Sequence, residues 1–240
     1  MGKRMILFLL VAIFLTGCMY PQERRMENIP VDQSVKMVQE AVEQFQEETT
    51  VLPIETRPAD TPVYEKYIID FGKLVPRYIP FVPTNAFENG GIYKYVLVDV
   101  ETEPKVKLLN LYLLNEINDI QRRVNLYKYK TTALPVKSMI DKNYFTIDFS
   151  QLNRKAPEIK SPFTSNFLPV IMDINGKVGI DYSMDLMIKL KEVVQLPPDG
   201  EDIRDLLVND SYFVPVASFE YTLKNNEPVF LFKDEGNQLR

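Results

Sequence analysis

The residues best suited to chemistry are two aspartates that stand in similar surroundings. Asp70 lies in residues 69–74, Ile-Asp-Phe-Gly-Lys-Leu, and Asp148 lies in residues 147–152, Ile-Asp-Phe-Ser-Gln-Leu. Two carboxyl groups held several ångströms apart can hydrolyse a glycan by general acid–base catalysis. An aspartate between an extended residue and a helical turn also caps free backbone amides. We expect capping at both positions, and a catalytic pair is the alternative.

A second group of carboxylates follows the first predicted hairpin strand. Asp99, Glu101 and Glu103 alternate with other residues, so an extended backbone would place them on one face. Oxygen ligands of this kind suit a hard cation such as Ca²⁺. The run lacks the glycine spacing of a calcium loop, and the corresponding residues 173–177 include a lysine. We therefore expect a solvated strand face, with Asp99 and Asp173 exposed, and a cation site is the alternative.

Missing residue types exclude most other catalytic sites. The chain contains no histidine, and Cys18 is its only cysteine. Catalysis by Ser-His-Asp or Cys-His, zinc sites built from Cys or His, and disulfides are therefore excluded. No glycine-rich phosphate-binding loop occurs, and we expect no cofactor. Carboxylate chemistry, a Ser–Lys arrangement, an oxygen-ligated cation or no chemistry at all remain.

The net charge argues against nucleic acid as a partner. The chain has 28 lysines and arginines and 33 aspartates and glutamates, a net charge of −5. Without residues 1–17 the basic count falls to 26 against 33, a net charge of −7. Nucleic acid and anionic bilayers both repel a chain of that sign. We expect lipid rather than charge to hold it at a membrane.

The N-terminus has the order of a lipoprotein signal peptide. Basic residues 3 and 4 precede an uncharged run, residues 5–15, that is too short for a bilayer span of about 20 residues. The four residues that close this run, residues 15–18, resemble the bacterial lipobox. This resemblance implies a signal peptide, residues 1–17, a diacylglyceryl group that anchors Cys18 in the bilayer, and a site on the extracytoplasmic face of the cell membrane. The lipobox residues are Leu15, Thr16, Gly17 and Cys18.

The elements that must position the aspartates follow a repeated pattern. Residues 18–30 are a polar tether, after which apolar residues recur with helical spacing in two stretches that are 82 positions apart. A Leu-Pro pair ends each helix, at 52–53 and 134–135, because proline disfavours helix at the preceding residue. The two stripes are Val31, Val35, Val38, Val42 and Phe45, and Leu113, Ile117, Ile120, Val124 and Tyr127.

Each helix is followed by a predicted antiparallel hairpin. The hairpins lie near residues 93–107 and 167–181, and Asn175-Gly176 indicates a type I′ turn in the second. A shorter third pass has an apolar stripe at Leu186, Leu190 and Val193, a Leu-Pro pair at 196–197, and a hairpin near 219–229.

The sequence therefore predicts an α+β fold of two to three repeated units, each an amphipathic helix packed on a small antiparallel sheet. We name these units module 1 (residues 31–112), module 2 (residues 113–182) and the shorter module 3 (residues 183–240). The order of helix and hairpin resembles the globular part of type IV pilins and pseudopilins. That similarity concerns architecture alone, since the chain has a lipobox in place of a prepilin cleavage site.

Several short segments resemble the YphF-type lipoproteins of Bacillus relatives. The resemblance implies a membrane-anchored protein on the outer face of a Gram-positive cell, and it implies no activity. It is firmest between Cys18 and about Leu111. The segments are Gly17-Cys18-Met19-Tyr20-Pro21, Leu52-Pro53-Ile54, Asp60-Thr61-Pro62, Ile69-Asp70-Phe71 and Asn89-Gly90-Gly91-Ile92.

Module 1 is rich in aromatic residues, which are favoured at binding surfaces and also fit half-buried strands. We expect a lipid-anchored, non-catalytic interaction or scaffold protein with a protein or cell-wall partner. The alternatives are a carboxylate-dependent hydrolase of cell-wall glycan and a small-solute-binding lipoprotein of a transporter. The candidate surface residues are Tyr64, Tyr67, Tyr78, Phe81 and Phe87.

Overall fold

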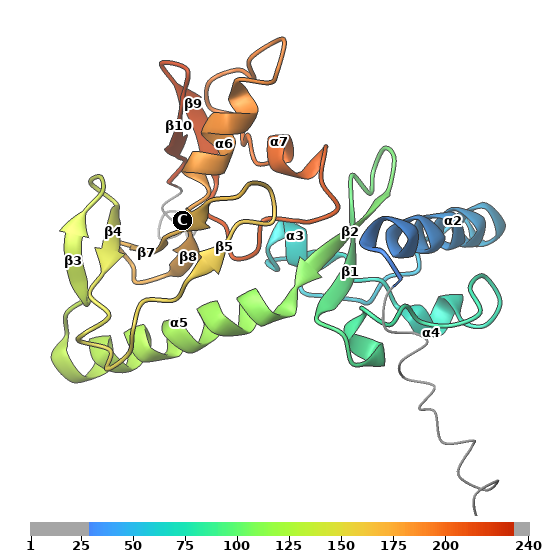
Figure 1. Cartoon of the computed structure of the whole chain (residues 1–240), viewed down its shortest axis with the longest axis horizontal. Helices are drawn as coiled ribbons and strands as arrows, with labels where there is room; N and C mark the ends of the chain where they lie inside the picture. Colours follow the sequence, from blue (N-terminus) through green and yellow to red (C-terminus); the bar gives the residue numbers. More distant parts are fainter. Residues whose placement is uncertain (1–28, 233–240) are drawn as a thin grey trace, which may run out of the picture.

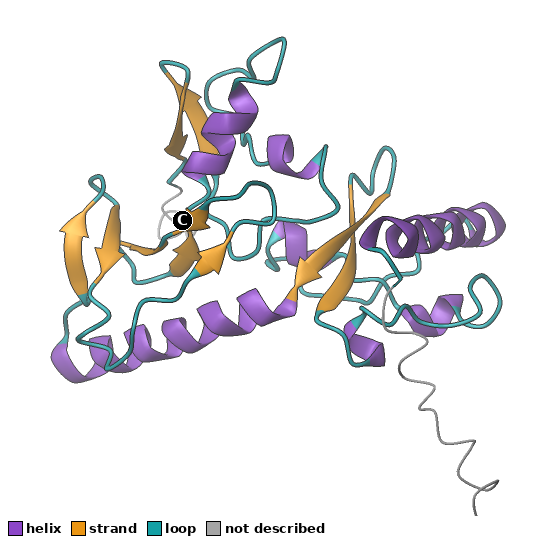
Figure 2. Cartoon of the chain, in the orientation of Figure 1, coloured by secondary structure: helices purple, strands orange, loops and turns teal. Residues whose placement is uncertain are grey.

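The computed structural model describes residues 29–232 and confirms the α+β class (Figures 1 and 2). Helices pack on small sheets whose neighbouring strands are antiparallel. The predicted signal peptide, the lipobox with Cys18 and nearly all of the tether lie outside the described residues. Within residues 29–232, no helix combines the length and the apolar character needed to cross a bilayer.

Module 1 begins with the predicted amphipathic helix, α2 (Val31–Thr49), which buries Val35, Val38 and Val42. Two one-turn helices and a 3-10 turn lead into a hairpin on which α2 packs. Isolated bridges from Ile68 to Val96 and from Ile54 to Ile69 widen that sheet. The other elements are α3 (Val63–Lys66), α4 (Phe71–Leu74), η2 (Phe87–Asn89), β1 (Tyr93–Val98) and β2 (Lys105–Asn110).

Module 2 repeats this order with a longer helix, α5 (Leu111–Thr131), and a four-stranded sheet in the order β3-β4-β7-β8. The predicted stripe is confirmed, because α5 buries Leu113, Ile117, Ile120 and Val124. A separate pair, β5 and β6, precedes the hairpin. The strands are β3 (Val136–Met139), β4 (Tyr144–Ile147), β5 (Ile159–Lys160), β6 (Phe167–Leu168), β7 (Val170–Asp173) and β8 (Val178–Ile180).

Module 3 is the shortest and departs most from expectation. Its helix α6 (Ser183–Leu190) buries Leu186 and Leu190 as predicted, but it ends well before the Leu-Pro pair at 196–197. A short helix and a hairpin follow, and α6 packs on the second strand of that hairpin. These elements are α7 (Asp205–Val208), β9 (Tyr221–Lys224) and β10 (Glu227–Phe230).

Matching hydrogen bonds show that modules 1 and 2 repeat in structure as well as in sequence. The side chain of Gln39 on α2 donates to Pro104 O at 2.9 Å and accepts from Val106 N at 2.7 Å. Gln121, the corresponding residue of α5, donates to Gly176 O at 2.8 Å and accepts from Val178 N at 2.7 Å. Each glutamine therefore ties its helix to the second strand of its hairpin.

The helix ends match as well. Thr50 and Thr132 adopt left-handed backbone conformations, with φ of 61° and 57°. The preceding threonines, Thr49 and Thr131, each donate a hydroxyl hydrogen bond to the carbonyl four residues earlier. A left-handed residue after the last turn stops a helix and lets its final carbonyls find donors.

The hairpin turn of module 2 forms at the predicted place but is not type I′. Only Gly176 has a positive φ, 87°, whereas a type I′ turn requires positive φ at both central residues. Gly176 N donates to Asp173 O and Asp173 N donates to Lys177 O, which is a type I turn with a glycine bulge. The carboxylate of Asp173 accepts from Asn175 N and Lys177 N and thereby stabilises this alternative.

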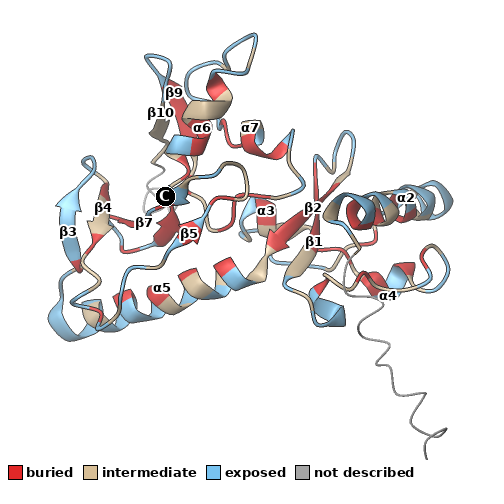
Figure 3. Ribbon diagram, viewed as in Figure 1, coloured by how far each residue is buried: buried red, intermediate tan, exposed pale blue. Residues whose placement is uncertain are grey.

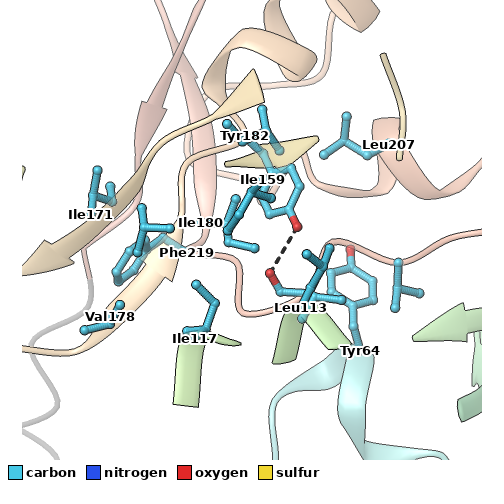
Figure 4. Packing of buried hydrophobic residues seen from close by; sticks show 14 of the residues in the cluster. Tyr64, Leu113, Ile117, Ile159, Ile171, Val178, Ile180, Tyr182, Leu207 and Phe219 are labelled. Atoms are coloured by element: carbon cyan, nitrogen blue, oxygen red, sulfur yellow. Dashed lines mark hydrogen bonds between the residues drawn. The ribbon is translucent and has the colours of Figure 1, made fainter. Parts of the chain in front are cut away.

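The hairpin of module 1 is buried on both faces (Figure 3). Tyr95 and Leu97 face the core that α2 covers, whereas Val96 and Val98 belong to a second core cluster. That second cluster contains the buried residues of modules 2 and 3 together, and Tyr64 of module 1 reaches it as well (Figure 4). Modules 2 and 3 therefore share one core, and module 1 packs against it.

A C-terminal segment pairs with both hairpins. We call residues 211–219 the strap. Leu108 N of β2 donates to Tyr212 O at 2.8 Å, and Ile180 N of β8 donates to Ala217 O at 3.0 Å. A side chain at Gly179 would lie 2.6 Å from Ala217 O, so glycine permits the strap to approach this closely. Module 3 thus supplies a parallel neighbour to the outer edge of each preceding hairpin.

We predict that the variant Gln39→Ala lowers the free energy of unfolding by about 1–3 kcal/mol, because Val106 N loses its acceptor at a buried site. Equilibrium unfolding in urea measures this change. Gln44→Ala, at an exposed position of the same helix, is the matched control and should change stability by less than about 0.5 kcal/mol. Equal effects of the two substitutions would contradict the role assigned to Gln39.

Candidate functional site

The two matched aspartates cap backbone and do not meet in one site. Asp70 accepts from Gly72 N at 3.0 Å, and Asp148 accepts from Ser150 N at 3.1 Å. Figure 1 places α4, which Asp70 caps, and β4, which precedes Asp148, at opposite ends of the molecule. Hydrogen bonds from Ser150 lead the causes that lower the pKa of Asp148, as expected of a capping carboxylate. The expected capping is confirmed, and the catalytic pair does not form.

The three carboxylates near the first hairpin do not share a strand face. Asp99, Glu101 and Glu103 all lie in the exposed turn between β1 and β2, not on an extended segment. Asp99 has a φ of 53°, and Glu103 lies 3.3 Å from the ammonium of Lys105. Among the described residues, no group of three or more acidic side chains is arranged to hold a metal ion.

Asp173 is buried, contrary to the expectation that it faces solvent. Only 6% of its surface is exposed, because its carboxylate turns inward to accept the two backbone amides of the hairpin turn. Asp99, which stands at the matching position of module 1, is exposed as expected. A polar residue at a hairpin end can thus serve the turn rather than the solvent.

The five aromatic candidates divide between core and surface. Tyr64 is 6% exposed and belongs to the shared core, so it is not available to a partner. Tyr67, Tyr78 and Phe81 are half-buried, and Tyr78 donates to Glu48 at 2.7 Å while its ring packs on Phe45. Phe87, at 54% exposed, is the candidate most open to solvent. The five residues do not form one continuous aromatic face.

Tyr64 instead joins module 1 to module 3. Its hydroxyl donates to Asp205 at 2.8 Å, and the guanidinium of Arg204 lies 5.1 Å from the centre of its ring. Arg204 is itself buried and pairs with Asp202 at 2.6 Å. Tyrosine type alone cannot distinguish a buried joint from a binding surface, so sequence reasoning missed this role.

A buried lysine reinforces the same joint. Lys107 on β2 is 7% exposed, and its ammonium donates to Val208 O at 2.7 Å and to Ser211 O at 2.5 Å. Burial lowers the pKa of this ammonium. The sequence holds a signal for it, since Lys107 interrupts the apolar strand Val106 to Leu109 and must therefore face a polar partner.

An exposed apolar surface lies where module 1 passes into module 2. We call Phe87, Ile92 and Tyr112 the junction patch. Their exposed fractions are 54%, 50% and 67%. The backbone holds them near one another, because Gly91 N donates to Ala86 O and Leu111 N donates to Ile92 O. The patch combines two aromatic rings with an aliphatic side chain, a composition typical of interface centres.

Two of the surface grooves formed by the described residues are large enough to receive a small ligand. One, of about 450 Å³, is bordered by Ile159, Phe167 and Leu168, and another, of about 550 Å³, runs between α2 and Tyr212 of the strap. Both are open to solvent rather than enclosed. A solute receptor requires a ligand to be largely enclosed, which neither of these two grooves provides.

Comparison with known protein families gives a match for module 1. Residues 31–110 match the model described as the YphF family N-terminal domain. The matched residues run from the start of α2 to the end of β2, and they support the resemblance drawn from the short segments in this part of the chain. Neither a curated protein nor a solved structure matches the chain.

We predict that the Tyr64–Asp205 joint makes the fold sensitive to alkaline pH. Burial, followed by the charge of Asp205, raises the pKa of Tyr64 far above its ordinary value. An unfolded tyrosine releases its proton near pH 10, whereas the native one keeps it. The unfolded state then binds fewer protons, so stability is full below about pH 10 and falls as the pH rises above it.

Tyr64→Phe tests this prediction through urea unfolding between pH 7 and pH 11. At pH 7 the variant should lose about 1–3 kcal/mol, because Asp205 loses a hydrogen bond. Above about pH 10 its stability should fall less steeply than that of the native chain, by about 1.4 kcal/mol per pH unit. Tyr112→Phe, at an exposed tyrosine, is the control and should leave both quantities unchanged. An undiminished slope in Tyr64→Phe would contradict the assignment.

Proposed function

We propose that the chain is a YphF-type lipoprotein, anchored through a diacylglyceryl group on Cys18 at the extracytoplasmic face of the cell membrane, and that it acts as a non-catalytic interaction or scaffold protein. The lipobox and the family match of residues 31–110 support the type and the location. The partner is a protein or a component of the cell wall.

The junction patch carries the proposal for binding. Phe87, Ile92 and Tyr112 are large apolar side chains that are at least half exposed and that come from neighbouring backbone. An exposed apolar cluster rimmed by charge, here the ion pair between Lys94 and Glu88, is typical of protein interaction sites. Desolvation of aromatic rings dominates the energy of such interfaces.

The joints between modules favour a scaffold. Tyr64 and Lys107 tie module 1 to module 3, and the strap pairs with the hairpins of modules 1 and 2. A body held together at these joints presents its surfaces in a fixed relative arrangement, which lowers the entropic cost of binding. The capping roles of Asp70 and Asp148 leave the carboxylate hydrolase without its first candidate pair.

In-cell cross-linking followed by mass spectrometry tests the anchor and the partner together. We expect the native chain to yield one dominant protein partner at the membrane, and we expect Cys18→Ala to lose it because the chain is no longer held there. An unchanged partner and location for Cys18→Ala would contradict the anchor. Diffuse cross-links from the native chain would contradict the interaction role.

A surface variant tests the patch itself. We predict that Phe87→Ser combined with Tyr112→Ser lowers the yield of the dominant cross-link about tenfold or more, because interface aromatics contribute about 2 kcal/mol each. The matched control is Val51→Ser combined with Val194→Ser, which removes apolar surface exposed elsewhere. Thermal unfolding should be alike in both variants. A cross-link that survives the first variant would show that the partner binds another surface.

A further inference from the structure

Charge is distributed unevenly along the folded chain. Module 1 has 8 basic and 13 acidic residues, and module 3 has 6 basic and 11 acidic residues, so each has a net charge of −5. Module 2 has 10 basic and 7 acidic residues, a net charge of +3. Because salt screens exposed charges beyond about 8 Å, a surface responds to local charge and not to the average over the chain.

The positive charge of module 2 gathers at its far end. We call residues 126–142 the basic tip; they comprise the last turns of α5, β3 and the start of the turn into β4. In Figure 1 the end of α5 and β3 form the left margin of the molecule, and Figure 3 shows both as exposed. The tip contains four lysines and a single acid, Asp141. The lysines are Lys128, Lys130, Lys137 and Lys142.

These lysines are not used to neutralise acidic side chains. None of the ion pairs found within residues 29–232 includes any of the four. Asp141 is occupied by the turn, since its carboxylate accepts from Asn143 N at 2.7 Å and from Tyr144 N at 2.9 Å. By contrast, Arg123 and Arg154 in the middle of module 2 both pair with Asp119.

Apolar side chains are interspersed with the lysines. Tyr129 is 85% exposed and Met139 is 71% exposed, among the most exposed large apolar side chains of the described residues. Leu126, Val136 and Ile140 are also exposed. A polyanion in solution would use the lysines alone. A bilayer interface also accommodates the exposed apolar side chains of the tip, because tyrosine is favoured at headgroup depth and aliphatic groups reach the acyl boundary.

We infer that the basic tip is a second membrane contact, which docks on the surface of an anionic phospholipid bilayer. The inference rests on the membrane-side location in the proposed function and goes beyond it, since the anchor and the junction patch use other residues. Each lysine near an anionic surface contributes about fivefold in affinity, so four together act strongly once an anchor keeps the chain nearby. The tip would then fix how the modules lie over the membrane.

The absence of tryptophan makes the test direct. The full chain carrying Tyr129→Trp is reconstituted in phosphatidylcholine vesicles with brominated acyl chains, with or without phosphatidylglycerol. Bromine quenches an indole that enters the interface. Tyr112→Trp, an exposed position at the other end of α5, is the matched control. We expect quenching at position 129 only, and only when phosphatidylglycerol is present.

A charge variant separates lipid recognition from insertion alone. Lys130→Glu and Lys137→Glu are added to the chain that carries Tyr129→Trp. Its apparent affinity for the anionic lipid, measured by the quenching at position 129, should fall about tenfold or more. Lys191→Glu with Lys224→Glu, exposed in module 3, should leave it unchanged. Equal quenching at positions 112 and 129, quenching that ignores phosphatidylglycerol, or a response to soluble polyphosphate but not to vesicles would each overturn the inference.

Sedimentation of the vesicles distinguishes a failure of the basic tip to contact the membrane from a failure of the lipid anchor. A chain that sediments with the vesicles but shows no selective quenching at position 129 is attached elsewhere, which overturns the tip and leaves the anchor intact. A chain with selective quenching that is washed from the vesicles by high salt is held by the tip alone, which supports the tip and contradicts the anchor.

Discussion

A two-stranded hairpin leaves backbone N–H and C=O groups unpaired along both of its edges, and alone it is too narrow to be stable. Modules 1 and 2 are built around such hairpins. In each, the inner edge is paired within the module, through Ile68 beside β1 and through β4 beside β7. The outer edges, at Leu108 and Ile180, are paired by the strap. The two modules therefore depend on a segment from the third.

Lys107 shows how far this dependence extends. Burying an ammonium is costly unless hydrogen bonds satisfy it, and the carbonyls of Val208 and Ser211 lie at the end of α7 and the start of the strap. Without module 3 the same residue would face water at the edge of an isolated hairpin. Lys107 thus favours the assembled arrangement over any packing in which the strap lies elsewhere, and Tyr64 acts alongside it through Asp205.

The helices and hairpins could be predicted because their signals are local. The spacing of Val35, Val38 and Val42 defines one helical face, and that helix ends before Pro53, as proline's effect on the preceding residue predicts. The capping roles of Asp70 and Asp148 followed from their position before a helical turn. Each of these predictions needed only a few consecutive residues, because backbone geometry limits the conformations that such a short segment can adopt.

The predictions that were wrong or missing involve residues that pair with partners distant in sequence, or side chains whose type suits more than one environment. The strap has no strand alternation, since residues 213–217 read Phe-Val-Pro-Val-Ala, and its pairing partner Leu108 lies about a hundred positions earlier. Tyr64 has a type that suits both surface and core. The carboxylate of Asp173 accepts two backbone amides and so stabilises a turn other than the expected type I′ turn. The candidate site was therefore less predictable than the fold, since exposure depends on tertiary packing.

Module 3 differs from modules 1 and 2 at the outer edge of its hairpin. Ile203 N donates to Tyr221 O as Ile69 N donates to Tyr95 O, so the two hairpins correspond residue by residue. In this register Pro228, opposite Leu223, stands where Val106 stands opposite Leu97. Val106 turns its N–H outward to Gln39, whereas proline has no N–H to satisfy. Pro228 therefore removes the need for a glutamine on α6. It also discourages a further strand from adding to that edge.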